Sequence, residues 1–255
     1  WSRDLPTAKS ALDQLRTLSE GDQALLLREL LGHPRWEIRK AASERISMLP
    51  PGAALPRLKE ALTDPDPHAQ YWAVQVLPDF GEPGLLALVG AAGSVKGEVK
   101  TFVMRALGRV PSPLTVKPLV EALDAADRSV REEAAGALIT NQQFSLAAVK
   151  NLLNAGTHHQ RFWAFKILAR VMGAKAIEPL AKILLTPPEA GAAEDQRPYA
   201  LAALSEMKHP KVIPPLLRTL RSDSTVLRAE AGEALVAQGE MAVPFLREEL
   251  VRAPA

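Results

Sequence analysis

The chain has 255 residues, of which 47% are hydrophobic and 24% are charged, so it can bury a sizeable core and is not disordered by composition. Its formal net charge of +2 is too balanced to identify a nucleic-acid-binding or membrane-binding protein. The lack of cysteine excludes disulfides, thiolate catalysis and cysteine-based zinc sites, and no apolar run reaches the roughly 18 residues of a membrane span.

A motif of three mostly apolar residues, each four positions after the last, recurs along the whole chain. This spacing places its members on one face of a helix. The first members are 31, 30, 31, 30, 36 and 31 residues apart, which predicts seven stacked helix pairs. In chain order the motif is Ile38/Ala42/Ile46, Ala69/Ala73/Leu77, Val99/Val103/Leu107, Val130/Ala134/Leu138, Gln160/Ala164/Leu168, Gln196/Ala200/Leu204 and Leu227/Ala231/Leu235.

The same spacing continues toward both ends of the chain. Ala11 and Leu15 fit the motif of an earlier pair, and Leu250 fits the end of a helix whose partner is missing. We therefore expect a single α-solenoid domain over residues 1–255, with a half-unit at each end, and we expect the chain to be part of a longer protein. The one long interval contains residues 186–195, which we expect to form a loop at the edge of the array.

The segment from Asp127 to Leu138 reads Asp-x-x-Val-Arg-x-x-Ala-x-x-Ala-Leu, and this pattern resembles the HEAT repeat. The period of about 30 residues is closest to the short HEAT-like repeat of the phycobilisome-lyase type. The resemblance covers nearly the whole chain. It implies an all-α fold, a right-handed superhelix of helix pairs, and it is unspecific for function because such arrays serve mainly as binding scaffolds.

A mostly cationic column follows the first member of each motif. We interpret it as a structural ladder, in which the guanidinium groups bridge to acidic residues in the turns of adjacent repeats. Asp66, Asp127 and Asp223 in those turns are also expected to cap the second helices. The cationic members of the ladder are Arg39, Lys100, Arg131, Arg161, Arg197 and Arg228.

Aromatic residues concentrate at two positions of the repeat, two and three residues after the first member of the motif. Because the second helices of a HEAT-type array line its concave surface, we expect these rings to face a groove that binds a partner. Arg105 and Lys166 lie six residues after the first member of their motif, and we expect them to add cation–π attraction beside these rings. The alternative is that some rings lean sideways and pack as core. The predicted groove residues are Tyr71, Trp72, Phe102, Arg105, Phe162, Trp163, Lys166 and Tyr199.

Catalytic and metal-binding patterns are absent from the sequence. There is no nucleophile elbow, no phosphate-binding loop and no paired-histidine zinc motif. His158 and His159 are adjacent, but the sequence offers no carboxylate or further histidine at ligand spacing, so we interpret them as a solvated turn. We therefore expect no catalytic residue, no metal and no cofactor, and we predict that the chain is not an enzyme.

The favoured function is a protein-binding scaffold with a protein or peptide partner. A HEAT-like nucleic-acid-binding protein or DNA glycosylase is less favoured, because the groove of a DNA-binding protein is clearly basic and four glutamates interrupt this one. A bilin-lyase-like role, or a regulatory module of a longer protein, is a further alternative. The sequence leaves the cellular compartment open. The four glutamates are Glu132, Glu133, Glu230 and Glu233.

Overall fold

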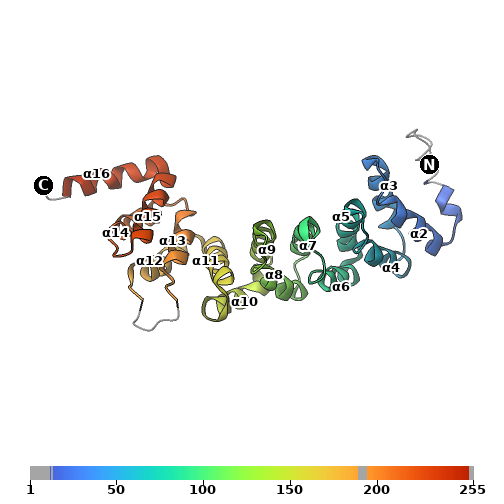
Figure 1. Ribbon diagram of the computed structural model, residues 1–255, viewed down its shortest axis with the longest axis horizontal. Helices are drawn as coiled ribbons and strands as arrows, with labels where there is room; N and C mark the ends of the chain where they lie inside the picture. Colours follow the sequence, from blue (N-terminus) through green and yellow to red (C-terminus); the bar gives the residue numbers. More distant parts are fainter. Residues whose placement is uncertain (1–11, 13, 189–193, 253–255) are drawn as a thin grey trace. The chain divides into compact units, whose positions relative to one another are not determined.

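The computed structural model describes residue 12 and residues 14–188 and 194–252, which form helices joined by short turns (Figure 1). These ranges contain no strand. The chain divides into two compact units, Trp1–Ser145 and Leu146–Ala255. Ala11 and residues 189–193 of the expected loop lie outside the described residues.

Helices of the first unit form two rows, one for each member of a pair (Figure 1). The first helices are α2 (Glu20–Leu30), α4 (Pro51–Ala61), α6 (Gly81–Ala91) and α8 (Val116–Ala122), preceded by the short η1 (Leu15–Thr17). The second helices are α3 (Trp36–Ile46), α5 (Pro67–Val76), α7 (Gly97–Arg109) and α9 (Arg128–Thr140). Each second helix contacts the next one in the row, and short 3-10 turns, η2 (Leu77–Phe80) and η3 (Pro113–Thr115), lead into α6 and α8.

The second unit repeats this arrangement. Its first helices are α12 (Ile177–Leu185) and α14 (Ile213–Thr219), followed by α16 (Val243–Arg252), and the division between the units falls within α10 (Gln142–Ala155). Its second helices are α11 (His158–Met172), α13 (Arg197–Ser205) and α15 (Thr225–Gln238), and α13 contacts both of the others. The 3-10 turns η4 (Gly173–Ala176), η5 (Pro210–Val212) and η6 (Gly239–Ala242) precede α12, α14 and α16.

The recurring motif is confirmed as the core of the array. Its middle residue is fully buried in every repeat, with 0% of its surface exposed. Six of these seven residues are alanine, whose small side chain lets the helices approach closely. The all-α helical-repeat fold expected from the sequence is thus the fold observed. The seven middle residues are Ala42, Ala73, Val103, Ala134, Ala164, Ala200 and Ala231.

Side chains in the turns fix where the second helices begin. Asp66 and Asp127 cap α5 and α9, accepting hydrogen bonds from the backbone N–H groups of residues 68 and 129 at 2.9 and 2.8 Å. The prediction is wrong for Asp223, because the N-cap of α15 is Ser224, whose hydroxyl accepts from the N–H of residue 227. Thr157 and Gln160 form a capping box at the start of α11, which explains a glutamine at a motif position.

Candidate functional site

The predicted rings of the first unit meet in one cluster, formed by Tyr71, Trp72 and Phe102. The ring centroid of Tyr71 lies 5.5 Å from that of Trp72 and 4.8 Å from that of Phe102, both in edge-on geometry. All three rings are half-buried. The side chains of α5 and α7 therefore share an aromatic surface, of which only part reaches solvent.

Arg105 lies on α7 and forms an ion pair with Glu133 of α9. The Nε atom of Arg105 lies 3.1 Å from Glu133 Oε1. The hydrogen bond with Glu133 raises the pKa of Arg105 above its ordinary value. Sequence reasoning treated these two residues as opposing charges in a groove, whereas the structure joins them across neighbouring helices.

Two rings of the second unit lie in the interior. Trp163 is 8% exposed and Tyr199 is 3% exposed, so both rings pack largely as core, which is the alternative that the sequence left open. The expectation of a ring that faces open solvent is wrong for Trp163, whereas Tyr199 still borders the groove described below. Each residue directly precedes the buried middle alanine of its helix, and neighbours along a helix point about 100° apart. The side chain of such a residue therefore points toward a neighbouring second helix and not directly away from the core. The ring of Tyr199 accordingly lies against Phe165 of α11, with 5.8 Å between centroids.

Lys166 connects α11 to α13. Its Nζ atom lies 4.5 Å from the ring centroid of Trp163 and 5.0 Å from that of Phe162, and it forms an ion pair of 2.6 Å with Glu206. These contacts hold the half-buried ammonium group in place and neutralise it. Lys166 is therefore a packing residue of the helix row.

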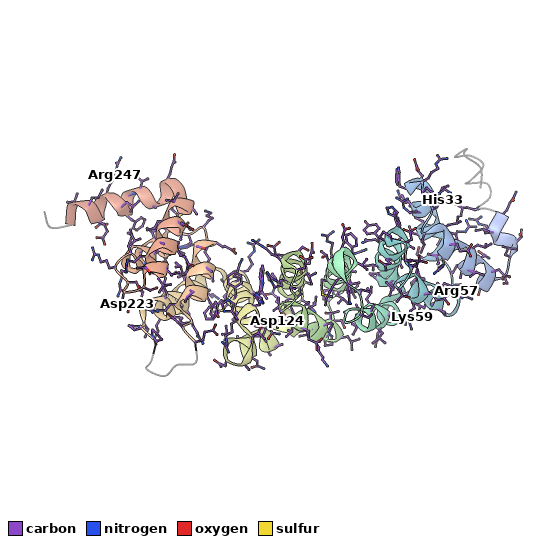
Figure 2. The ribbon with its side chains drawn as sticks, viewed as in Figure 1. His33, Arg57, Lys59, Asp124, Asp223 and Arg247 are labelled. Atoms are coloured by element: carbon purple, nitrogen blue, oxygen red, sulfur yellow. The ribbon has the colours of Figure 1, made fainter. Side chains whose placement is uncertain are left out.

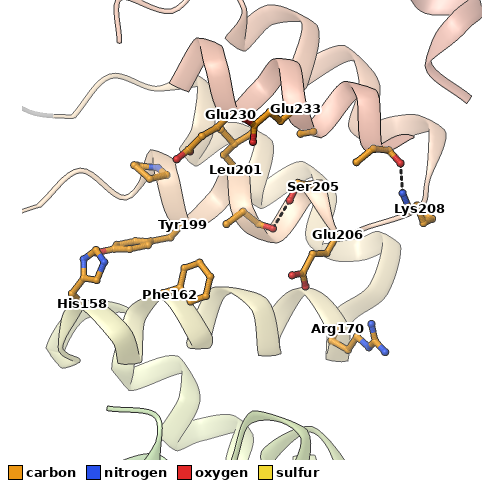
Figure 3. Close-up of a pocket in the computed structure, with 14 residues that line it drawn as sticks. His158, Phe162, Arg170, Tyr199, Leu201, Ser205, Glu206, Lys208, Glu230 and Glu233 are labelled. Carbon is orange, nitrogen blue, oxygen red and sulfur yellow. Dashed lines mark hydrogen bonds between the residues drawn. The ribbon is translucent and has the colours of Figure 1, made fainter. Parts of the chain in front are cut away.

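A groove of about 830 Å³ lies on the second unit along α11, α13 and α15 (Figure 3). We call it the second-unit groove. Its volume is in the range of typical ligand pockets. Residues that line it include His158, Phe162 and Arg170 of α11, Tyr199 and Ala202 of α13 with Glu206 directly after that helix, and Glu230, Glu233 and Ala237 of α15.

One end of the second-unit groove is a hydrogen-bonded polar cluster. The hydroxyl of Tyr199 lies 2.7 Å from His158 Nδ1 and donates to Glu194, and Glu194 also lies 3.1 Å from His158 Nδ1 and pairs with Arg161. Burial raises the pKa of Tyr199. The sequence did not reveal a carboxylate near His158, because Glu194 comes from the insertion that precedes α13.

The α15 side of the groove carries two exposed carboxylates, Glu230 and Glu233. Within the described residues neither forms an ion pair. Burial, followed by repulsion from Glu233, raises the pKa of Glu230 above its ordinary value. Glu230 directly precedes the buried Ala231, the same helical position that buries Tyr199, which explains its partial loss of solvent.

We expect Glu233→Gln to lower the pKa of Glu230 toward its ordinary value without restoring it fully, since burial remains. A carboxyl whose pKa is raised by folding binds protons more readily in the folded state. The contribution of Glu230 to the free energy of unfolding therefore decreases as pH rises from the ordinary pKa through the raised one. In the Glu233→Gln variant this decrease is smaller, because the two pKa values are closer together. Carboxyl carbon shifts of Glu230, followed by NMR against pH, measure the effect. An unchanged midpoint would attribute the whole shift to burial.

Three of the predicted ladder arginines bind their own repeat. Arg39 donates to the carbonyl oxygens of residues 33 and 34 at 2.6 and 2.8 Å, and Arg131 donates to those of residues 125 and 126 at 2.5 and 2.8 Å. Arg228 does the same with residues 222 and 223. These guanidinium groups close the turn before their own helix. The expected bridge to an acid of the adjacent repeat is wrong for them, because the turn carbonyls are closer acceptors.

Two ladder arginines do reach the next repeat. Arg161 pairs with Glu194, and Arg197 pairs with Asp223 at 3.3 Å as well as with Asp195 in its own turn. The remaining member, Lys100, is half-buried on α7. The cationic column therefore closes its own turn at Arg39, Arg131, Arg197 and Arg228, and it connects neighbouring repeats at Arg161 and Arg197 in the second unit.

The described residues offer no constellation for metal chemistry. Nowhere in residues 12, 14–188 and 194–252 do three or more His, Cys, Asp or Glu side chains gather so that they could hold a metal ion.

Among the described helices, none combines the length and the apolar character needed to cross a membrane. Figure 2 shows charged side chains such as Lys59, Asp124 and Arg247 distributed along both units.

Comparison with known proteins identifies the repeat. A family model of HEAT repeats matches residues 23–93 and 55–139, and no curated protein matches the chain. An archaeal HEAT-like repeats protein from Thermococcus onnurineus NA1 is 17% identical over 88% of this chain and 98% of that chain, with a TM-score of 0.45. A chain of the CpcE–CpcF complex of phycocyanin lyase from Nostoc sp. PCC7120 is 15% identical over 90% and 93%, with a TM-score of 0.40. A chain of the Kap95p–RanGDP structure is 16% identical over 100% of this chain and 42% of that chain, with a TM-score of 0.46.

Proposed function

Because a family model of HEAT repeats matches residues 23–139 of this chain, we propose that the protein is a non-catalytic scaffold that binds a protein or peptide along its second helices. The second-unit groove is the observation that carries the proposal. It combines about 830 Å³ of open volume with aromatic, small apolar and charged walls. Grooves of this composition suit a partner segment that has both apolar and polar side chains.

The rings support this role in different ways. Phe162 lines the groove and is half-buried, so part of its ring is available to a partner. Tyr199 also lines the groove, but its hydroxyl is held by His158 and Glu194, so it forms a rigid wall. In the first unit, Tyr71, Trp72 and Phe102 provide a second apolar surface. Partly exposed aromatic rings of this kind are typical anchors of protein interfaces.

The charges of the groove favour a protein partner over nucleic acid. Phosphate groups require cationic side chains along the binding surface. The lining of this groove carries two cations, Arg170 and Lys208, against three carboxylates, and Glu230 and Glu233 on α15 are without ion pairs among the described residues. A phosphate backbone placed along α15 would meet two unpaired negative charges.

Site-specific photo-crosslinking tests the proposal. A benzophenone amino acid is placed at Ala237, which lines the groove and is exposed, and at Glu178, which is exposed on α12 in the other helix row. In cells that produce the protein, we expect a discrete protein adduct from position 237 and none from position 178. Equal labelling from both positions, or adducts to nucleic acid alone, would refute a protein-binding groove.

A further inference from the structure

We propose that the second-unit groove binds a basic, apolar segment of a partner protein, in which an arginine or lysine lies beside Glu230 and Glu233 and an adjacent apolar side chain packs on Phe162. This inference rests on the proposed scaffold function and assigns the chemistry of the partner. It follows from which charges in the groove are already neutralised and which are not.

The acidic groups around the groove fall into two classes. Glu206 is paired with Lys166 at 2.6 Å, and Glu194 is paired with Arg161. Glu230 and Glu233 have no cationic partner among the described residues. The two paired carboxylates are satisfied by the protein itself, so the unsatisfied negative charge of the groove lies on α15.

Nearby cations do not compensate these two glutamates. Lys208 lines the groove but donates to the backbone carbonyl of Ala237 (Figure 3). Arg170 lines the groove from α11, and within the described structure no ion pair joins it to Glu230 or Glu233. Both side chains keep their positive charge, but neither is paired with Glu230 or Glu233 in the described residues, so α15 forms the acidic side of the groove and can accept a cation from a partner.

Electrostatics makes a cation the favoured neighbour of α15. Glu230 and Glu233 are three residues apart on one helix, and like charges at this spacing repel each other. The raised pKa of Glu230 is a consequence of partial burial and, after it, of this repulsion. A guanidinium or ammonium group beside both carboxylates would relieve the repulsion, and the interaction gains strength because protein replaces water on one side.

Apolar surface makes the favoured ligand a peptide and not a small cation. The groove walls include Phe162 and small side chains at Pro198, Ala202, Ala234 and Ala237. Small residues leave room for a bulky side chain, and the half-buried ring of Phe162 gains from being covered. Figure 3 shows Phe162 on α11 and the two glutamates on α15 on opposite sides of α13 residues that line the same groove. A segment with alternating basic and apolar residues satisfies both surfaces.

Fluorescence anisotropy with labelled octapeptides tests this assignment on the full chain. The probe alternates leucine and arginine, one control replaces arginine by neutral citrulline, and the other replaces leucine by serine. We expect the leucine–arginine peptide to bind at least about tenfold more tightly than either control, because each control removes one of the two interactions. Equal binding of the citrulline peptide would overturn the proposal.

Charge variants locate the binding site. We expect Glu230→Gln with Glu233→Gln to weaken binding of the leucine–arginine peptide by about tenfold. The matched control, Glu178→Gln with Glu240→Gln, removes the same charge from exposed positions of the same unit outside the groove lining and is expected to leave binding unchanged. Equal weakening by both variants would mean nonspecific attraction and would overturn the proposal. Circular dichroism confirms that each variant is folded.

Charge reversal gives a positive result that misfolding cannot produce. With Glu230→Lys and Glu233→Lys we expect the preference to switch to a peptide that alternates leucine and glutamate. If no octapeptide binds but crosslinks from position 237 persist, the chemistry assigned here is wrong and the scaffold function stands. If both are lost, the scaffold function itself fails.

Discussion

Gly84→Ala is expected to lower the free energy of unfolding by about 3 kcal/mol, as overpacking against rigid backbone does. A Cβ atom at Gly84 would overlap the carbonyl oxygen of Leu77 and lie 2.8 Å from its carbonyl carbon. Gly84 is buried in α6, where that helix turns back against η2. Because the obstacle is backbone, the helix itself has to move. Urea denaturation followed by far-UV circular dichroism measures the loss.

Gly90→Ala is the matched control in the same helix. Gly90 is exposed, and an added Cβ would have no neighbour within 4 Å. We therefore expect the substitution to raise the free energy of unfolding by about 0.5–1 kcal/mol, through helix propensity alone. Similar losses at both glycines would contradict the close contact between α6 and η2.

Phe165→Ala is expected to lower the free energy of unfolding by about 3–5 kcal/mol. Phe165 is 2% exposed and belongs to the core of the second unit, where its ring lies beside that of Tyr199. Truncation would leave a cavity under the wall of the groove. Thermal and urea unfolding of the variant, compared with the wild type, measure the effect.

Phe162→Ala tests the same substitution three residues earlier in α11. Its ring is half-buried and lines the groove, so we expect a loss of about 1–2 kcal/mol, in proportion to the smaller area that leaves contact. This variant is expected to remain folded and to weaken peptide binding. A larger loss of unfolding free energy for Phe162→Ala than for Phe165→Ala would contradict the assignment of Phe165 to the core and of Phe162 to the groove wall.

The repeat could be predicted from the sequence because it depends on one periodicity. Residues four apart share a helical face, and the alanines at Ala73, Ala134 and Ala231 are all fully buried as that spacing requires. This periodicity can be recognised in the sequence without knowing which helices pack against one another. The short period and the turn residues then fix the order of helices.

The direction of the rings could not be predicted, since it depends on neighbours that the motif does not encode. The residues before and after the middle alanine point about 100° to either side of it. Both sides of α13 are covered, because α11 and α15 contact it. Tyr199 before Ala200 and Leu201 after it are consequently both buried. The sequence offered both an open groove and rings packed sideways as core, and the contacts of α13 with α11 and α15 decide for the second at Tyr199.

The hydrogen-bond and ion-pair partners of the polar residues could not be predicted from the sequence pattern either. Arg131 and Arg228 bind backbone carbonyls, which every residue possesses and which no composition reveals. Glu194 reaches His158 from a position 36 residues away in the chain. Glu230 and Glu233 were visible as acids, but only the arrangement of cations around them shows that they are unpaired within the described structure.

The column of fully buried small residues has a consequence for how such a protein can change. Spacing between helices is fixed at one position of each repeat, whereas the groups that line the groove occupy others. Under the proposed function, substitutions at Ala202, Glu233 or Ala237 are therefore expected to alter partner preference while the distance between repeats stays constant. If the groove binds as proposed, ligand selectivity and thermal tolerance depend on largely separate sets of positions, so each can be changed by evolution or engineering with little effect on the other.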